Sequence, residues 1–386
     1  MPATDPLIRD SSALASLCER LRAEPYVTVD TEFMTERTYY PRLCLVQLAG
    51  DTEAAAVDTL ERDLDLSPLA ALLSDPEVLK VMHAGRQDLQ ILRRECGVLA
   101  EPFFDTQVAA AFCGFGEQPG YDRLVTELLD LEIDKSAQAT DWSRRPLAQR
   151  QIDYALSDVI HLRPVYEQLL ARLRDAGREG WVVEEMDALL DSARHEPSPE
   201  QAWRRVKIKR PTRRALGILQ ELAAWREIEA RERDLPRGWV VRDDALAEIA
   251  LHPPRDRRQL ARVRGMKEAA AHGAEGRAIL AGIERALSRP EGEWPEPPKK
   301  RTGPTADESM VALLQALLRL RCDAAGVATR MVANRDDLEC IALDPEADVP
   351  ALHGWRREIF GEDARALRDG RLSLTGADGK VVVNEH

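Results

Sequence analysis

The sequence predicts an α/β domain with a mixed central sheet, followed by two smaller all-α domains. In the first half of the chain, short segments rich in β-branched and apolar residues alternate with helical patterns, as in α/β proteins. The strand pattern ends near residue 105, and a composition change near residue 195 begins a series of charged helical segments. A length of 386 residues is enough for two or three domains.

Four segments are predicted as strands because they are short and rich in β-branched, aromatic or other apolar residues. They are residues 26–33, 42–49, 54–60 and 79–82. Because the first three follow one another with no helix between them, we expect an antiparallel meander within the sheet. Helices are predicted over residues 87–96, 106–112, 122–131, 146–158 and 159–176, and Asp105 is expected to cap the second of these.

Two polar, proline-containing segments, residues 195–201 and 289–304, are predicted to be linkers. They divide the chain into three predicted domains, which cover residues 1–195, 203–289 and 304–386. The last two are expected to be helical throughout, because their apolar residues recur at helical spacing and strand-like alternation is missing.

The two helical domains share an Arg-Asp-Asp sequence, at residues 242–244 and 335–337. Apolar residues follow each copy at matching positions, and an arginine-rich helical segment precedes each copy. This pattern indicates two copies of one small module. The alternative is that Arg-Asp-Asp begins two unrelated helices, because acidic residues satisfy the free N–H groups at a helix start.

The overall composition is that of a globular protein in a reducing compartment. Hydrophobic residues make up 44% and charged residues 31%, which does not favour disorder. The six cysteines include no CxxC pair, so buried free thiols are expected rather than disulfides or a zinc site. No apolar run is long enough for a membrane span and no secretory signal is recognisable, so a cytoplasmic location is expected.

Two acids interrupt the first predicted strand. Asp30 and Glu32 are two residues apart, and the two-residue period of a strand places both carboxylates on one face. Two adjacent carboxylates in an apolar strand repel each other and lose hydration, which is costly unless a cation lies between them. Mg²⁺ and Mn²⁺ prefer such oxygen ligands. The alternative is a solvated strand end.

Three further residues could join this pair. Asp88 lies where the strand over residues 79–82 gives way to a helix, and at such a junction an acid often only caps the helix. Tyr154 and Asp158 are four residues apart in a predicted helix and therefore share one face. They enter the same pocket if that face points at the strand with Asp30; otherwise they are an ordinary solvated pair.

The combination of these residues resembles the DEDD exonuclease superfamily with tyrosine in its third motif, and more closely ribonuclease D. The resemblance covers roughly residues 5–195. It rests on six stretches: VDTEF at 29–33, HAGRQDL at 83–89, DKS at 134–136, TDW at 140–142, RPL at 145–147 and YALSD at 154–158. The two helical blocks resemble the HRDC domains that follow the nuclease domain in bacterial ribonuclease D, and the second block is the more divergent.

The resemblance implies a ribonuclease H-like exonuclease domain whose catalytic residues are Asp30, Glu32, Asp88, Tyr154 and Asp158. The four acids would bind two divalent ions, Mg²⁺ or Mn²⁺, and Tyr154 would orient the attacking water. It further implies hydrolysis from a 3′ end with release of nucleoside 5′-monophosphates. The implied substrates are RNAs with short 3′ extensions, notably tRNA precursors.

A net charge of −13 opposes nucleic-acid binding only if the charge is evenly spread, since local basic runs can still hold phosphates. We expect RNA contacts from Lys135, Arg144, Arg145, Arg204, Arg205, Lys207, Lys209 and Arg210, and a further basic run is Lys299, Lys300 and Arg301. The alternative is a set of solvated helix faces.

Three functions fit these motifs. The first is a 3′-to-5′ exoribonuclease, expected to act as a monomer and without a membrane partner. The second is a DNA exonuclease of the same superfamily, because recognition of the 2′-hydroxyl is a local matter that the motifs do not decide. The third is an inactive RNA-binding relative, which the presence of all five motif residues disfavours.

Overall fold

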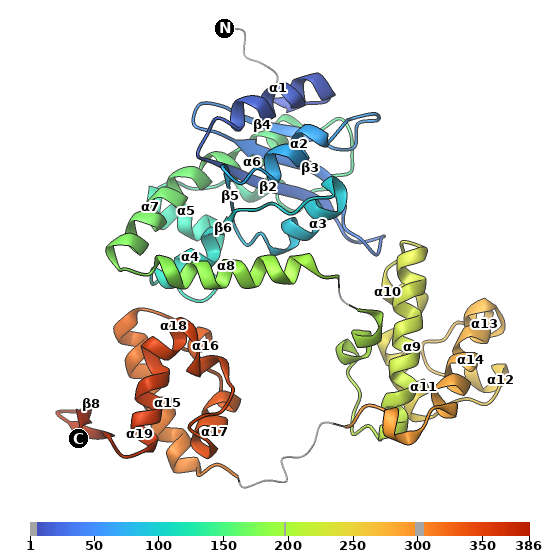
Figure 1. Ribbon diagram of the computed structural model, residues 1–386. Helices are drawn as coiled ribbons and strands as arrows, with labels where there is room; N and C mark the ends of the chain where they lie inside the picture. Colours follow the sequence, from blue (N-terminus) through green and yellow to red (C-terminus); the bar gives the residue numbers. More distant parts are fainter. Residues whose placement is uncertain (1–5, 197, 298–304) are drawn as a thin grey trace. The chain divides into compact units, whose positions relative to one another are not determined.

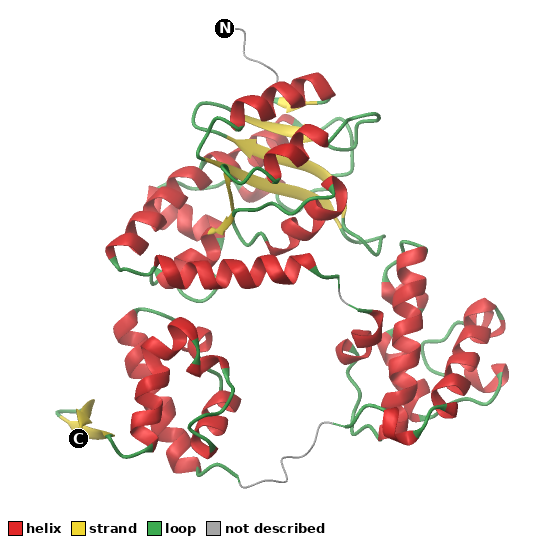
Figure 2. Cartoon of the chain, viewed as in Figure 1, coloured by secondary structure: helices red, strands yellow, loops and turns green. Residues whose placement is uncertain are grey.

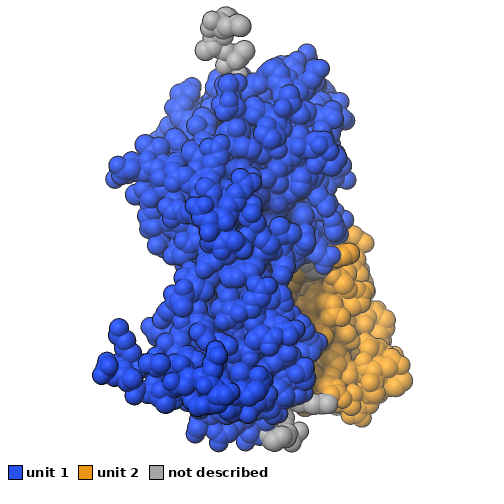
Figure 3. All heavy atoms as spheres, turned by 60° about the vertical axis from the view of Figure 1, so that its left-hand side comes forward, with its two compact units in different colours: residues 1–32, 43–194, 303–386 blue, residues 33–42, 195–302 orange. Residues whose placement is uncertain are grey.

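The computed structural model describes residues 6–196, 198–297 and 305–386. The chain divides into two compact units, which are coloured separately in Figure 3. Unit 1 contains residues 1–32, 43–194 and 303–386, and unit 2 contains residues 33–42 and 195–302. Residues 33–42 run from the last two residues of one strand to the first residue of the next strand, but they group with a helical region far along the chain.

A mixed sheet of six strands, in the order β1-β4-β3-β2-β5-β6, organises the first part of the chain (Figure 1 and Figure 2). The strands are β1 Leu7–Ile8, β2 Tyr26–Met34, β3 Arg42–Ala49, β4 Ala54–Asp58, β5 Leu79–Met82 and β6 Phe103–Asp105. Strand β3 pairs antiparallel with β4, whereas β5 pairs parallel with both β2 and β6. The predicted mixed sheet is therefore confirmed, and the four predicted strands correspond to β2, β3, β4 and β5.

Strands β1 and β6 were missing from the sequence prediction. They contain two and three residues, so neither is long enough to show a two-residue alternation. Each exists through pairing with a longer neighbour, β1 with β4 and β6 with β5. Strand β6 ends at Asp105, whose carboxylate accepts N–H groups of Gln107 and Val108 and so caps the next helix, as predicted.

Eight helices accompany the sheet in the described residues up to 194. They are α1 Ser11–Leu21, α2 Ser67–Leu73, α3 Arg86–Cys96, α4 Thr106–Phe112, α5 Tyr121–Leu129, α6 Gln149–Ile160, α7 Leu162–Asp175 and α8 Glu179–Arg194, with a 3₁₀ turn η1 at Lys135–Ala137. Helix α6 packs against β4 and α7 against β5. The buried hydroxyl of Thr28 in β2 donates to the carbonyl of Val159 at 2.8 Å, which ties α6 to the central strand.

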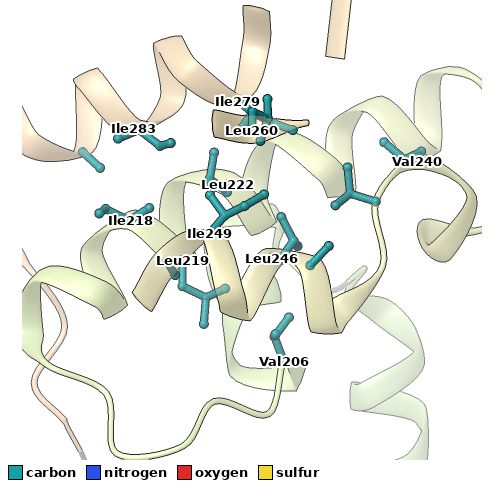
Figure 4. Close-up of a cluster of buried hydrophobic side chains, with 14 of the residues drawn as sticks. Val206, Ile218, Leu219, Leu222, Val240, Leu246, Ile249, Leu260, Ile279 and Ile283 are labelled. Carbon is teal, nitrogen blue, oxygen red and sulfur yellow. The ribbon is translucent and has the colours of Figure 1, made fainter. Parts of the chain in front are cut away.

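Unit 2 is built around a long helix, α9 Arg213–Glu232. The other elements are η2 Pro199–Arg205, α10 Arg237–Val240, α11 Asp243–Leu251, α12 Arg257–Leu260, α13 Glu268–His272, α14 Ala274–Ser288 and η3 Glu291–Glu293. Their apolar side chains form one core, which includes Leu222, Leu246 and Ile279 (Figure 4). Gly217 in α9 allows Trp294 to pack closely, since a Cβ there would lie 2.5 Å from the indole Cδ1.

The C-terminal block repeats the order of elements found in unit 2. It contains α15 Glu308–Ala325, α16 Thr329–Val332, α17 Arg335–Leu343, η4 Pro350–Leu352, α18 Gly354–Arg356, η5 Arg357–Gly361 and α19 Glu362–Arg368. In both blocks a long helix is followed by a four-residue helix and then by a nine-residue helix. Asn334 caps α17, but Arg242 before α11 makes no side-chain cap, so shared capping does not explain both copies of Arg-Asp-Asp.

One sequence expectation is wrong at the C-terminus, where helix alone was predicted. Residues Leu372–Ala377 (β7) and Lys380–Glu385 (β8) form an antiparallel hairpin. Three consecutive valines favour a strand, and Asp378 and Gly379 adopt the positive φ angles of a tight hairpin turn.

The described cysteines are free, as expected, and three of the six are buried. No helix in the described part of the chain combines the length and apolar character needed to cross a membrane.

Candidate metal centre

Three carboxylates meet beside strand β2. Asp30, Glu32 and Asp158 each present a carboxylate oxygen, and these oxygens lie within 4.8 Å of one another. Alternation along β2 places the first two on one face, and α6 contributes the third. The structure therefore brings together three of the five residues predicted from sequence, from segments more than 120 positions apart.

The electrostatics of this cluster are unfavourable without a cation. Burial, reinforced by the neighbouring carboxylates, raises the pKa of Glu32 to about 9 and that of Asp30 well above its usual range. Burial likewise raises the pKa of Asp158 to about 7. A bound divalent cation would reverse the sign of the local potential and favour the charged forms.

The donor set fits such a cation. All three groups offer oxygen atoms, the ligands that Mg²⁺ and Mn²⁺ prefer. The Oδ1 atom of Asp158 is buried and accepts no hydrogen bond from the described residues. A buried acceptor without a partner is costly, so a ligand in the cluster would satisfy an otherwise unpaired atom.

Asp88 lies in the first turn of α3, near enough to raise the pKa of Asp30. Its carboxylate accepts a hydrogen bond from the hydroxyl of Thr31, which stands between the two acids of β2. Burial raises the pKa of Asp88 to about 6, although the Thr31 hydroxyl opposes this shift. Asp88 is thus tied to the same strand without belonging to the group of three close carboxylates.

Asp105 fixes the turn that leads to Asp88. Its two carboxylate oxygens accept the N–H groups of Ala84 at 3.0 Å and Gly85 at 2.9 Å. Ala84 has a φ of 54°, a conformation that alanine adopts only when surrounding contacts impose it. Gly85 is required for another reason, since a Cβ there would lie 2.7 Å from the Cβ of Met82.

Tyr154 lies one helical turn from Asp158, and its phenol interacts with that carboxylate. Burial, followed by the charges of Asp158 and Glu32, raises the pKa of Tyr154, so its phenol keeps its proton at neutral pH. The ring of Trp142 lies 6.2 Å from the Tyr154 ring. His83 was not predicted to belong to the site. Burial lowers its pKa to about 4, so its imidazole is neutral at pH 7.

Three residues that support the site were not predicted from the sequence as members of it. The hydroxyl of Tyr121 donates to the backbone carbonyl of Asp158 at 2.8 Å, and Thr31 and Asp105 hold the segment with Asp88. A Thr between two acids and an Asp before a helix were visible in the sequence. Their partners lie 57 and 20 to 21 positions away, so only the fold identifies what they hold.

Arg145, expected to contact RNA, has a structural role instead. Its Nε and Nη2 atoms bind the buried carboxylate of Asp58 in β4, at 2.6 Å and 2.5 Å. Its remaining N–H groups donate to the carbonyls of Cys44, Trp142 and Arg144. These bonds use the full donor set of a guanidinium group, which leaves none for a phosphate.

Replacing Arg145 by methionine is therefore expected to lower the free energy of unfolding by about 2 kcal/mol, because Asp58 keeps a buried charge without its partner. The arginine is partly exposed, so water reduces the penalty below that of a fully buried pair. Urea unfolding measures the loss. The exposed Arg144→Met is the control and should change stability little. A weaker affinity for RNA in Arg145→Met with unchanged stability would contradict this role.

The other basic residues expected to hold RNA lie at the surface. Lys135 pairs with Asp122 at 2.6 Å and Arg144 with Asp141 at 3.1 Å. In unit 2, Arg204 donates to Gln201, and Arg205 approaches Glu227. Lys207, Lys209 and Arg210 follow as exposed residues. The run Lys299, Lys300 and Arg301 lies outside the described residues.

Comparisons with known proteins identify the family and the fold of the chain. A family model for the 3′-5′ exonuclease domain matches residues 7–174, and one for the HRDC domain matches residues 215–283. Ribonuclease D of Gluconacetobacter diazotrophicus is 48% identical, with 97% of this chain and 95% of the relative covered. Ribonuclease D of Granulibacter bethesdensis has the same identity and coverage. The crystal structure of Escherichia coli RNase D superposes with a TM-score of 0.82 at 33% identity, covering 94% of this chain and 98% of that chain.

An exonuclease domain with a carboxylate cluster, followed by an HRDC domain, defines the class of protein: a hydrolytic 3′-to-5′ exonuclease. Identity at this level over nearly the whole chain then fixes the family. The chain belongs to the ribonuclease D family. The predicted family, fold class and enzyme class, that of an exoribonuclease, are confirmed.

Proposed function

We propose that Asp30, Glu32, Asp88 and Asp158 bind two divalent ions, Mg²⁺ or Mn²⁺, and that this centre hydrolyses RNA from its 3′ end. The observation that carries the proposal is the group of three carboxylates with oxygen atoms within 4.8 Å of one another, together with a buried Asp158 oxygen that has no hydrogen-bond partner among the described residues. In such a centre, divalent ions would stabilise the negative charge that develops on the phosphoryl and leaving oxygens and would lower the pKa of the attacking water.

The residues around the ions have separate roles in this proposal. The charges of Asp88, Asp158 and Glu32 all raise the pKa of Asp30, so we propose that Asp30 would contact both ions. Glu32 and Asp158 would complete the ion site on the side of the attacking water, and Asp88 would support the ion beside the leaving group. Tyr154 keeps its proton at neutral pH, so it would orient the water through a hydrogen bond rather than deprotonate it.

The proposed substrates are RNAs with accessible 3′ ends, and tRNA precursors with short 3′ extensions are the leading candidates. The Escherichia coli relative is described as an exoribonuclease involved in structured RNA processing. The products would be nucleoside 5′-monophosphates. A monomer in the cytoplasm is the proposed state of the enzyme, with domains over residues 1–195, 203–289 and 304–386, the last being a second, divergent HRDC-like domain.

The direct test is digestion of a 3′-extended tRNA with Mg²⁺, with Mn²⁺ and with a chelator. Stepwise shortening to the mature 3′ end, with 5′-monophosphate products, supports the proposal. The same RNA carrying a 3′-phosphate and a DNA oligonucleotide of matched sequence serve as controls. Equal digestion of the DNA would favour a DNA exonuclease, and the absence of products under every condition would favour an inactive RNA-binding relative.

The segment before α9 is the proposed path of the RNA backbone in unit 2. Val206 is buried and Ile208 packs against the unit 2 core, whereas the intervening and following side chains, Lys207 and Lys209, are exposed. Neighbouring Arg204 and Arg205 add positive charge along the same stretch. Cations placed in this way neutralise phosphates without reading the base sequence.

Replacing Lys207 or Lys209 by glutamine should weaken RNA binding about equally for different sequences. Each lost phosphate contact reduces the slope of log K against log salt by about 0.7 for single-stranded RNA. Titrations at several salt concentrations measure that slope. Lys380→Gln in the C-terminal hairpin removes the same charge elsewhere and is the control. An unchanged slope in both test variants would remove these lysines from the RNA path.

A further inference from the structure

The connection that follows the catalytic strand belongs to the helical unit. Strand β2 carries Asp30 and Glu32, and the next residue, Phe33, already groups with unit 2. Residues 33–42, drawn with unit 2 in Figure 3, return the chain to strand β3 at Arg42. Chain continuity therefore links the metal-binding end of β2 directly to contacts made inside unit 2.

Tyr39 makes the central contact of this connection. Its hydroxyl donates to the Oε1 atom of Glu227 and accepts from Arg231 Nε at 3.0 Å and Arg237 Nη2 at 2.8 Å. The Arg237 guanidinium also lies 4.4 Å from the centre of the Tyr39 ring. One half-buried phenol thus joins a carboxylate and two arginines, and its hydrogen-bonding capacity is fully used.

Glu227 is the acid that organises this cluster. Its side chain is only 1% exposed, although it sits on helix α9 and carries a charge. Burial opposes ionisation, but hydrogen bonds from Arg237 and Tyr39 and the charge of Arg231 bring its pKa to about 2. Arg237 binds both carboxylate oxygens, at 2.6 Å and 2.7 Å. A buried charge with this many partners holds a single geometry.

The backbone of the same connection is held independently. The Oδ1 atom of Asp234, just beyond the end of α9, accepts the N–H groups of Tyr39 and Tyr40, each at 3.1 Å. Asp234 itself has a φ of 47°, a left-handed conformation that aspartate tolerates better than most residues. Side-chain and backbone contacts together fix the middle of the connection to the C-terminal end of α9.

We infer that Tyr39 is a positioning residue for the nuclease reaction. By holding residues 33–42, the first helical domain would fix the end of β2 that presents Glu32 to the metal ions. The helical domain would then affect catalysis as well as RNA capture. This inference rests on the proposed role of Glu32 as a metal ligand. Small displacements of reacting groups are enough for such an effect, because a shift of about 1 Å can cost about 100-fold in rate.

Tyr39→Phe tests the inference, since it removes one hydroxyl and keeps the ring. We expect kcat on a 3′-extended RNA to fall about tenfold, which corresponds to a displacement smaller than 1 Å. The KM for RNA should stay within about twofold, because the basic residues of unit 2 are unchanged. The dissociation constant for Mg²⁺, measured by titration calorimetry in the absence of RNA, and with it the Mg²⁺ requirement of the enzyme, should rise, since Glu32 would be held less firmly.

Tyr26→Phe is the matched control. Tyr26 begins the same strand, its hydroxyl donates to Glu167 at 2.5 Å, and Arg163 lies 4.2 Å from its ring centre. It therefore offers the same chemistry, a phenol with a carboxylate and an arginine, entirely within unit 1. The control should lose some thermal stability and keep the kcat and the Mg²⁺ requirement of the wild type.

The outcomes separate clearly. A loss of kcat with a raised Mg²⁺ requirement in Tyr39→Phe, but not in Tyr26→Phe, supports the inference, and Tyr39→Ala should deepen it. Wild-type kinetics in a folded Tyr39→Ala enzyme would overturn it, as would equal kinetic losses in both phenylalanine variants. If instead the wild-type enzyme shows no metal-dependent cleavage, the proposed function fails, and the inference that rests on it is overturned with it.

Discussion

Asp158→Asn is expected to lower metal-dependent RNA cleavage by at least about 1,000-fold, because a metal centre supplies several kcal/mol of transition-state stabilisation. The substitution keeps the shape of the side chain but removes the charge that would hold a divalent ion. The Oδ1 atom of Asp158 is a buried acceptor without a hydrogen-bond partner among the described residues, so it is available to bind an ion. Single-turnover digestion of a 3′-extended RNA measures the loss.

The same variant should fold normally. Without metal, Asp158 contributes to the raised pKa values of Asp30 and Glu32, so a neutral asparagine relieves repulsion. The thermal midpoint of the metal-free variant should equal or exceed that of the wild type. Asp153→Asn is the control, since Asp153 lies on the same helix and its side chain is exposed. A fully active Asp158→Asn enzyme would remove Asp158 from the metal centre.

The sequence predicts the site well where local geometry decides the arrangement. Two acids two residues apart in a strand must share a face, and Tyr154 and Asp158 one helical turn apart must do so too. Which strand the helix faces is not a local property. The Thr28 hydroxyl that ties α6 to β2, and the Tyr121 hydroxyl that holds the Asp158 carbonyl, act over more than 35 positions.

The sequence expectations that the structure corrects have two physical origins. Arg145 looked like a phosphate ligand because it is basic and lies near the motifs, but its partner Asp58 is buried 87 positions earlier. Strand β6 has three residues and shows no period, and it exists because β5 lies beside it. The hairpin β7–β8 stands where helix is expected, although its valines favour a strand. For Arg145 and β6 a partner elsewhere in the sequence decides the structure, whereas the hairpin follows a local strand signal.

The grouping of residues 33–42 with unit 2 is a stronger example of a feature that the local sequence does not predict. Nothing in the segment from Phe33 to Arg42 distinguishes it from an ordinary connection between two strands. Its partners Glu227, Arg231 and Arg237 lie nearly 200 positions later on and after helix α9. The local sequence therefore does not predict that residues 33–42 belong to the same compact unit as residues 195–302.

The metal-free enzyme is expected to lose stability as the pH rises from about 5 to about 9, and Mg²⁺ is expected to reverse this trend. Burial raises the folded-state pKa of Asp88 to about 6, of Asp158 to about 7 and of Glu32 to about 9. In the unfolded chain these groups titrate near about 4. As the pH rises, these carboxyl groups therefore lose their protons at a lower pH in the unfolded chain than in the folded protein. Their contribution to the free energy of unfolding is fully present below about pH 4, and it is lost as the pH rises through the folded-state pKa values.

Metal binding has the opposite dependence on pH, because a divalent ion binds the carboxylates in their ionised form. At 100 times the dissociation constant, Mg²⁺ stabilises the folded state by about 2.7 kcal/mol, which raises the thermal midpoint by about 5 °C or more. Calorimetry at pH 5, 7 and 9, with chelator and with Mg²⁺, should give a metal-induced shift that grows with pH. Because other groups also titrate, the metal-induced shift of the wild type is compared with that of Asp158→Asn at each pH. The difference between the two shifts reports on this centre alone. If that difference has the same value at all three pH values, the carboxylates do not form a metal centre of the kind proposed, and the loss of activity in Asp158→Asn would need another cause.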